Sequence, residues 1–317
     1  MSTAALAEET RLVARRTARN KAFDGALAVA SGATLLLVLA VLTIILFDVV
    51  RNGLPRLSLG FLTEAPREGM TAGGIFPAII GMVEMVVLMT LAGVPVGVAT
   101  AIYLHEYASA VSPVTRAIRI AVANLAGVPS IVFGLFGLGF FVQFVGAGID
   151  KTFFHGEKVY GQPALIWAAL TMAVLTLPVV IVATEEALRA VPRELREASL
   201  ALGATKFQTV FAVVVPQASA GILTGTILAV SRGAGEVAPI LFTGAAYFLP
   251  RLPSGLSSQF MSPSYHVYVL STQSPDVDAT KPILYATVLV LLALTFTLNL
   301  AAVVVRARVR RGLKGAA

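Results

Sequence analysis

Six long stretches without a charged residue restrict what this chain can fold into. They cover residues 25–47, 85–104, 120–149, 159–184, 207–231 and 282–305. A transmembrane α-helix needs about 20 mainly apolar residues, and each stretch reaches that length. The stretches are continuously apolar and do not alternate, so membrane-spanning strands are not expected. The sequence therefore predicts an all-α integral membrane protein with six transmembrane helices.

Composition agrees with this class. Hydrophobic residues make up 57% of the chain and charged residues only 13%, whereas a soluble domain carries about 25% charged residues. Much of the surface is therefore expected to face lipid. The first apolar stretch follows a basic segment, but it is too long for a signal peptide and no small-residue cleavage site closes it. We expect it to be retained as the first transmembrane helix.

Several function classes are disfavoured. The chain has no cysteine, which excludes disulfides, thiolate metal sites and cysteine nucleophiles. His105, His155 and His266 lie in predicted loops far apart in sequence and suggest no metal cluster. No nucleophile–base constellation indicates an enzyme, and no bound cofactor is expected. The net charge of +7 does not indicate nucleic acid, because the basic residues flank the apolar stretches as orientation signals do.

The distribution of Lys and Arg predicts the orientation. With the N-terminus in the cytoplasm, sixteen of the 24 basic residues fall on the cytoplasmic side and seven outside, while the one left over, Arg232, is expected inside the membrane. This bias predicts that both termini are cytoplasmic. Residues 237–250 form a further uncharged run, but it is too short to span, and a seventh span would move the Arg-rich tail outside. We expect a partial or re-entrant helix there.

These observations divide the chain into segments. The first helix is set apart by a loop rich in Pro, Gly and charge, which suggests a peripheral helix followed by a five-helix core. The predicted segments are a basic cytoplasmic N-terminus (1–24), a first transmembrane helix (25–50), an external loop (51–73), a membrane core (74–305) and a basic cytoplasmic tail (306–317).

The segment 185–206 is too polar to span and too regular to be a linker. Pro192 suits the first turn of a helix, Gly203 can take the left-handed conformation that ends one, and a new helix is expected near Thr205. The apolar residues of the segment follow 3- and 4-residue spacing and predict a single stripe: Leu188, Val191, Leu195, Ala198 and Leu202. The result is a cytoplasmic helix–turn–helix elbow. It could lie on lipid headgroups or dock on a soluble partner, and its chemistry alone favours neither.

A motif in the elbow favours docking. The elbow resembles the EAA loop of binding-protein-dependent ABC importers in the order and spacing of its residues: Glu197-Ala198-Ser199, then three residues, Gly203, nine further residues and Val213 to Pro216. That family has EAA, three residues, Gly, nine residues and I-x-L-P; here Ser199 replaces the second Ala, and Val replaces Ile and Leu. The resemblance implies a coupling helix that sits in a groove of an ATPase subunit. The residues it assigns to this coupling are Leu195, Glu197, Ala198, Ser199, Leu202, Gly203 and Pro216.

The same resemblance implies the architecture of the complex. Residues 74–305 would form a type I, MetI-like permease core, to which the first helix is an addition. The chain has no G-x-x-x-x-G-K-[ST] phosphate loop, so ATP and Mg²⁺ are expected to be used by a separate subunit. The implied partners are a sister permease, an ABC ATPase dimer and a periplasmic or lipid-anchored binding protein, assembled in the bacterial cytoplasmic membrane.

The run Ser231–Glu236 follows the fifth apolar stretch directly. Arg232 and Glu236, four residues apart, are expected on one helix face, close enough to pair. Charged residues inside a membrane are costly and usually mark a substrate or ion path, although a neutralised pair could also lock the bundle. Arg offers a planar fork for a tetrahedral oxyanion, Glu236 would compete with that anion, and Gly233 and Gly235 would let the backbone break locally. The predicted substrate path therefore comprises Ser231, Arg232, Gly233, Gly235 and Glu236.

Four stretches resemble the PstA-type permease family of phosphate importers: residues 73–75, 101–107, 127–138 and 231–239. The last reads SRGAGEVAP, against SRAxGETAP in the family, with Gly233 for Ala and Val237 for Thr. The resemblance implies that phosphate is the cargo and that Arg232 and Glu236 serve its passage. No family pattern covers Glu84, which is expected to face a cavity or a protein neighbour.

Other functions remain open at this point. A permease for molybdate or sulfate would share the elbow. A secondary transporter would need no ATPase, but it would be expected to show an internal repeat and no elbow. A membrane sensor without transport activity is the remaining alternative.

Overall fold

The computed structural model describes residues 3–109 and 111–315. Six helices in this part of the chain are long and apolar enough to cross a membrane. They are Phe23–Arg56, Phe76–Tyr107, Ser130–Phe153, Leu165–Arg189, Lys206–Ala234 and Val277–Arg308. The predicted all-α fold with six transmembrane helices is confirmed.

The chain divides into two compact units, residues 1–52 and residues 53–317. The first unit is a single helix, α1 (Thr3–Gly53). From Phe23 onward α1 carries apolar side chains on every face, which is the pattern of a helix surrounded by lipid. The side chains of the basic residues predicted for its start, Arg11 to Arg19, lie outside the described residues.

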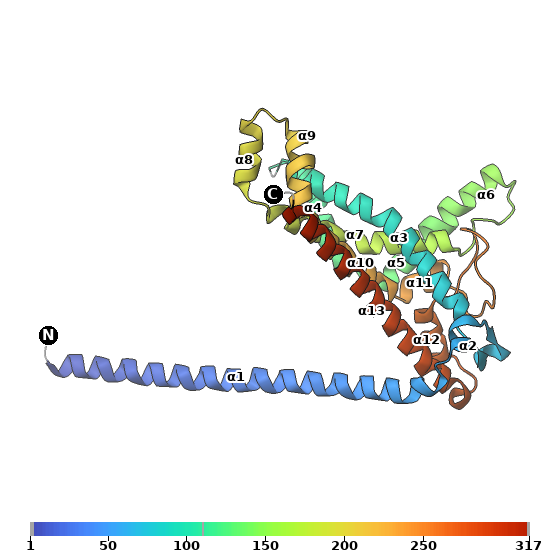
Figure 1. Ribbon diagram of the computed structural model, residues 1–317, viewed down its shortest axis with the longest axis horizontal. Coiled ribbons are helices and arrows are strands. Elements are labelled where there is room, and N and C mark those ends of the chain that lie inside the picture. The colour runs from blue at the N-terminus through green and yellow to red at the C-terminus, as the bar shows by residue number, and fades with distance from the viewer. Residues whose placement is uncertain (1–2, 110, 316–317) are drawn as a thin grey trace. The chain divides into compact units, whose positions relative to one another are not determined.

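The second unit begins with small elements and continues as a helical bundle (Figure 1). The small elements are η1 (Leu54–Arg56), α2 (Leu59–Thr63), η2 (Glu68–Met70) and a two-stranded antiparallel ribbon, β1 (Pro66–Arg67) and β2 (Ala72–Gly73). The bundle comprises α3 (Phe76–Ile102), η3 (Tyr103–Tyr107), α4 (Pro113–Ala126), α5 (Ser130–Phe136), η4 (Gly137–Gly146), α6 (Ala147–Phe153), α7 (Leu165–Arg189), α8 (Arg193–Ala201), α9 (Lys206–Gln208), η5 (Thr209–Val214), α10 (Val215–Ala234), α11 (Ala238–Thr243), α12 (Pro263–Thr272) and α13 (Val277–Gly315). The segments η3, η4 and η5 are π-helical and join the α-helices on either side.

Helix α7 packs against both α3 and α10 through glycines. A Cβ atom on Gly97 of α3 would lie 2.7 Å from Cγ1 of Val180, and one on Gly221 of α10 would lie 2.6 Å from Cβ of Ala187. Such small residues let helix backbones approach closely in a membrane. The four-residue spacing of glycines in α3 and α10 is therefore explained by packing on α7.

The third spanning helix begins ten residues later than the uncharged run predicts. Helix α4 ends at Ala126, and a new helix, α5, begins at Ser130. Between them lies Pro129, which donates no backbone hydrogen bond and disfavours helical backbone in the residue before it. α4 is amphipathic, and its Ile118 and Val122 pack against Leu104 and Ile181. Absence of charge alone does not distinguish such a helix from a span.

The second span begins at Phe76, close to the predicted start of the core at residue 74, and it includes Glu84, which is half-buried and lines an open pocket with Leu165 and Pro253. The fourth span begins at Leu165 rather than at residue 159, where its uncharged run begins, shortly after Gly161 and Pro163. The position of Glu84 agrees with the expectation that it faces a cavity.

The predicted re-entrant segment at 237–250 contains only a six-residue helix, α11, after which the chain turns back. Ala246 donates a 2.8 Å backbone hydrogen bond to Phe260, which holds this turn. α11 packs against α5, where a Cβ on Gly134 would lie 2.8 Å from the carbonyl oxygen of Ala238. This segment is too short to span a membrane, in agreement with the prediction.

Helix α12 follows, and it corrects the prediction that His266 lies in a loop. His266 is 2% exposed within α12, and neither ring nitrogen has a hydrogen-bond partner among the described residues. Burial lowers the pKa of His266 to about 4, so the ring is neutral at physiological pH. His105 also lies outside a loop, in the π-helical turn η3.

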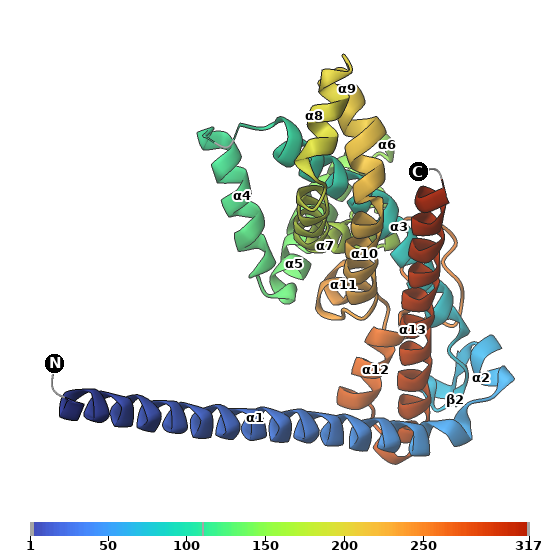
Figure 2. The same ribbon diagram turned by 60° about the vertical axis from the view of Figure 1, so that its left-hand side comes forward.

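Within the second unit, the elbow and the C-terminal end of α13 lie at one end of the bundle, and α2 and α12 lie at the other (Figures 1 and 2). This arrangement agrees with the charge distribution, which assigns the elbow and the tail to the cytoplasmic side.

Candidate coupling elbow and substrate path

The elbow consists of α8, a tight turn and α9. Gly203 ends α8 with φ of +86°, a conformation that glycine adopts without steric cost. The backbone N–H groups of Gly203 and Ala204 donate to Leu200 and Ser199 at 3.0 and 3.2 Å, which satisfies carbonyls at the helix end. The left-handed turn predicted at Gly203 is confirmed.

The next helix begins with a reciprocal cap. The N–H of Gln208 donates to Oγ1 of Thr205 at 3.3 Å, and the N–H of Thr205 donates to Oε1 of Gln208 at 2.9 Å. Two backbone donors at the helix start are thereby satisfied. The predicted helix start near Thr205 is confirmed, and the helix continues through η5 into α10.

The single apolar stripe predicted for the elbow was wrong. Leu188 and Val191 are 0% and 5% exposed and pack beneath the elbow with Val210 and Val214. α7 ends at Arg189, and the chain turns before α8 begins, so the regular spacing crosses a break. The remaining members of the stripe are exposed on the elbow itself: Leu195, Ala198 and Leu202.

The other predicted coupling residues take different positions. Glu197 is exposed, and Pro216 lies in the first turn of α10. Oγ of Ser199 lies 2.9 Å from Oγ1 of Thr209, so this departure from the family motif joins α8 to η5.

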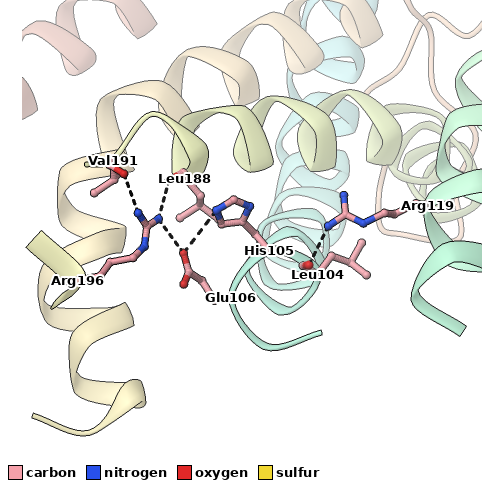
Figure 3. Close-up of polar contacts among 7 residues, drawn as sticks. All are labelled: Leu104, His105, Glu106, Arg119, Leu188, Val191 and Arg196. Carbon is pink, nitrogen blue, oxygen red and sulfur yellow. Dashed lines mark hydrogen bonds and ion pairs between the residues drawn. The ribbon is translucent and has the colours of Figure 1, made fainter. Parts of the chain in front are cut away.

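Sequence reasoning missed a buried ion pair that holds the elbow (Figure 3). Nη2 of Arg196 lies 3.0 Å from Oε1 of Glu106, and the two side chains are 19% and 9% exposed. The same guanidinium donates to the carbonyl oxygens of Val191 at 2.7 Å and Leu188 at 2.8 Å. The partners are 90 residues apart, so spacing gave no signal; the one hint was that each lies in or beside a stretch that resembles a family motif.

A second pair lies on the other side of η3. Nη1 of Arg119 on α4 lies 2.9 Å from Oε2 of Glu185 on α7. Nη2 of Arg119 donates to the carbonyl oxygen of Leu104 at 2.9 Å. Oε1 of Glu185 is buried without a hydrogen-bond partner in the described parts of the chain. Nε2 of His105 lies 3.8 Å from Glu106, so the inner end of α3 is surrounded by polar contacts.

The predicted Arg232–Glu236 pair is present, with Nε lying 3.6 Å from Oε1. The expectation of a shared helix face was wrong: α10 ends at Ala234, and Glu236 lies beyond that end. Arg232 remains accessible, since 62% of its side chain is exposed, against 19% for Glu236. A guanidinium has five N–H donors, so this arrangement leaves donors available for an anion.

The neighbouring residues place this pair within the bundle. Oγ of Ser231 donates to Oδ1 of Asn299 on α13. The backbone carbonyl of Glu236 accepts a 3.2 Å hydrogen bond from Oγ of Ser264 on α12. The end of α10 is therefore tied to two other helices.

The two glycines of the run have different surroundings. A Cβ on Gly233 would lie 2.9 Å from Sδ of Met89, so this glycine lets α10 approach α3. Gly235 follows the last helical residue, and its φ of −92° is open to any residue. The break in the backbone is at Gly235, and Gly233 serves packing.

No three His, Cys, Asp or Glu side chains gather in the part of the chain that the structure describes.

Six spanning helices with an inner helix–turn–helix elbow define a transmembrane permease of an ABC importer. Residues 93–311 match the family model of the binding-protein-dependent transport system inner membrane component, and the chain belongs to this family. It is therefore a multi-pass membrane protein of a binding-protein-dependent transport system.

Curated relatives agree. The chain is 34% identical over 257 residues to a probable ABC transporter permease protein, YqgI, of Bacillus subtilis, covering 76% of this chain and 82% of that one. It is 37% identical over 238 residues to the phosphate transport system permease protein PstA of Yersinia pestis, covering 74% and 70%. PstA of Pasteurella multocida is 37% identical over 220 residues, covering 69% and 68%. The predicted resemblance to PstA-type permeases is confirmed.

Solved structures support the fold. A chain of the alginate ABC transporter, solved with an alginate-bound periplasmic protein, aligns with a TM-score of 0.58 at 17% identity, covering 84% of this chain and 92% of that one. A chain of the inward-facing MetNI methionine ABC transporter aligns with a TM-score of 0.55 at 16% identity, covering 74% and 97%. At these identities the likeness concerns the MetI-like permease fold alone.

Proposed function

We infer that this chain is the permease subunit of an ATP-driven importer of inorganic phosphate. The observation that carries this proposal is the accessible guanidinium of Arg232 at the end of α10, held on one side only by Glu236. Relatives named as phosphate transport permeases share 37% identity with most of the chain. Arg matches the tetrahedral geometry of phosphate through its planar fork of donors.

Glu236 gives the pair a second role. When the path is empty, its carboxylate neutralises Arg232 at 3.6 Å and reduces the cost of a charge in the membrane. When phosphate arrives, the carboxylate competes with it for the same guanidinium. This competition keeps binding weak enough for release, which a conducting path requires.

The elbow provides coupling to an ATPase. Its exposed tip includes Leu195, Glu197, Ala198 and Leu202, which we assign to the contact with the ATPase. Gly203 and Ser199 shape and fasten the turn behind that tip, and Pro216 lies in the first turn of α10. In this proposal the permease has no catalytic site and binds no cofactor, and ATP with Mg²⁺ is used by the partner.

The proposed complex contains a sister permease, an ABC ATPase dimer and a periplasmic or lipid-anchored phosphate-binding protein. Together the two permeases enclose a path across the cytoplasmic membrane. Family membership supports the dependence on a binding protein. The sister permease and the phosphate specificity rest on the names of the PstA relatives.

The test is uptake of radiolabelled phosphate by cells that contain the complete complex, with wild type compared with Arg232→Gln. We expect Arg232→Gln to abolish uptake while the ATPase still co-purifies. Arg116→Gln serves as a matched control because Arg116 is an exposed arginine on α4, away from the path. Unchanged uptake by Arg232→Gln would contradict the proposal.

Molybdate or sulfate is the second candidate cargo, because both are tetrahedral oxyanions that the same guanidinium can bind. Competition by unlabelled molybdate and sulfate separates the two proposals. Selective competition by phosphate supports phosphate import, whereas uptake blocked by either other anion would assign the path to that anion.

A further inference from the structure

Helix α8 cannot be held in place by a hydrophobic core. None of its nine residues, all of which the structure describes, is buried. Leu195 and Leu200 are 40% and 49% exposed. An element that buries no apolar side chain depends on polar contacts for its position. Among the described residues, the side-chain hydrogen bonds and the ion pair that join α8 to the bundle come from Arg196 and Ser199.

Arg196 reaches three segments at once. Its guanidinium contacts the end of α7 through Leu188, the following turn through Val191, and η3 through Glu106 (Figure 3). The carbonyl of Leu188 also accepts a 3.3 Å hydrogen bond from the N–H of Val191, so Arg196 adds a charged donor to the end of α7. The planar fork of arginine presents donors on separate nitrogens, which suits acceptors on three different segments.

The segment η3 is also held by polar contacts on the side away from the elbow. Arg119 of α4 donates to Leu104 and pairs with Glu185 of α7. Leu104 itself is 2% exposed. The inner end of α3 therefore lies between two arginines, one from α4 and one from the elbow, and both arginines are also bonded to α7.

We propose that Arg196 and Glu106 are a positioning pair that makes α8 and the inner end of α3 move as one body. Through this joint, a displacement of the elbow by an ATPase reaches the spanning helices instead of being lost in a loose turn. The inference rests on the proposed docking of the elbow, and it adds the residues that transmit the movement.

The joint can be measured directly because the chain has no cysteine. Spin labels on Glu194→Cys and Ser109→Cys, both exposed positions, report the distance between α8 and the segment after η3 in the complete complex. We expect a narrow distance distribution in the parent and a broad one after Arg196→Met. Arg193→Met is the matched control, since Arg193 is exposed on the same helix and forms no ion pair with any described residue; it should keep the narrow distribution.

Transport provides the second readout, measured without spin labels. In Arg196→Met we expect the ATPase to co-purify and to hydrolyse ATP, while phosphate carried per ATP falls about tenfold. Glu106→Gln keeps the shape of the side chain and one acceptor oxygen, so its phosphate carried per ATP should lie between the values of the parent and of Arg196→Met. If Arg196→Met does not accumulate in cells, Glu106→Gln takes its place in the experiment. An unchanged distance distribution together with an unchanged transport ratio would overturn the proposal.

Failure of the cargo assignment would look different. If the parent complex carries no phosphate, the proposed cargo is wrong, but the distance distributions need no cargo. A broad distribution confined to the Arg196 and Glu106 variants would then still support the joint, and equal distributions in all variants would overturn it.

Discussion

Two of the Arg–Glu pairs among the described residues, Arg196–Glu106 and Arg232–Glu236, differ in how completely the arginine is satisfied. Arg196 is 19% exposed, lies 3.0 Å from Glu106 and donates to two carbonyls as well. Arg232 is 62% exposed, lies 3.6 Å from Glu236 and has no other partner among the described residues. The guanidinium of Arg196 is surrounded by protein acceptors, whereas the guanidinium of Arg232 keeps donors that are free for a ligand.

This difference supports a structural role for Arg196 and the proposed anion-binding role of Arg232. A guanidinium whose donors are already used has little to offer a ligand, and removing it leaves a buried carboxylate without its partner. A guanidinium with free donors loses only a modest contact with its carboxylate when an anion arrives. The number of satisfied donors, more than the presence of the pair, indicates which role each arginine has.

The largest expected effect comes from Arg232→Gln. Uptake should be abolished because the variant loses charge-assisted hydrogen bonds to phosphate, each worth about 1.5–3 kcal/mol. The distance between α8 and α3 should stay unchanged, because Arg232 does not belong to the joint. A broadened distance distribution in this variant would break the comparison between the two pairs.

Gly203→Val should have the next largest effect. Its φ of +86° is strained for a β-branched residue by about 1–3 kcal/mol, so the turn behind the elbow tip should distort. We expect roughly tenfold less ATPase to co-purify with a permease that still inserts into the membrane. Normal co-purification, with Gly203→Asn as the milder control, would count against docking by the elbow.

Exchanging the partners of the buried pair sharpens the comparison further. Arg196→Glu combined with Glu106→Arg restores opposite charges, but it places a carboxylate beside the carbonyls of Leu188 and Val191. We therefore expect transport per ATP to remain about fivefold below the parent, because each carbonyl loses a charge-assisted donor. Full recovery would mean that charge alone, without the fork, makes the joint.

Ser199→Ala should have the smallest effect. It removes the contact with Thr209 at 2.9 Å, and a single such bond contributes about 0.5–1.5 kcal/mol. A loss of about twofold in transport per ATP is expected, visible in a paired assay with the parent. A loss as large as that of Arg196→Met would show that Ser199 is the main fastening of α8.

The sequence predicted the spans and the elbow well because both depend on local signals. Apolar runs of bilayer length marked the helices, and Gly203 and Thr205 marked the turn. Helix starts were less predictable, since α4 is free of charge for seven residues after Arg119 without being part of a span. The Arg196–Glu106 joint could not be predicted, because only the packed bundle brings these two residues together.

The candidate path was partly predictable for the same reason. Arg232 and Glu236 are close in sequence, so their pairing followed from spacing. That Ser231 contacts Asn299 depends on how α13 lies against α10. The end of α10 falls just before Gly235, one of the two glycines at which a local break of the backbone was expected. The burial of His266 likewise follows from the packing of α12 and has no local signature.

The absence of a buried side chain in α8 makes the elbow an exchangeable part. Its outward residues, Leu195, Ala198 and Leu202, are separate from those that attach it, Arg196 and Ser199. Substitutions at the tip can therefore accumulate during evolution without disturbing the bundle. On the proposed docking of the elbow, a few surface residues would suffice to refit such a permease to a different ATPase, with the membrane part left as it is.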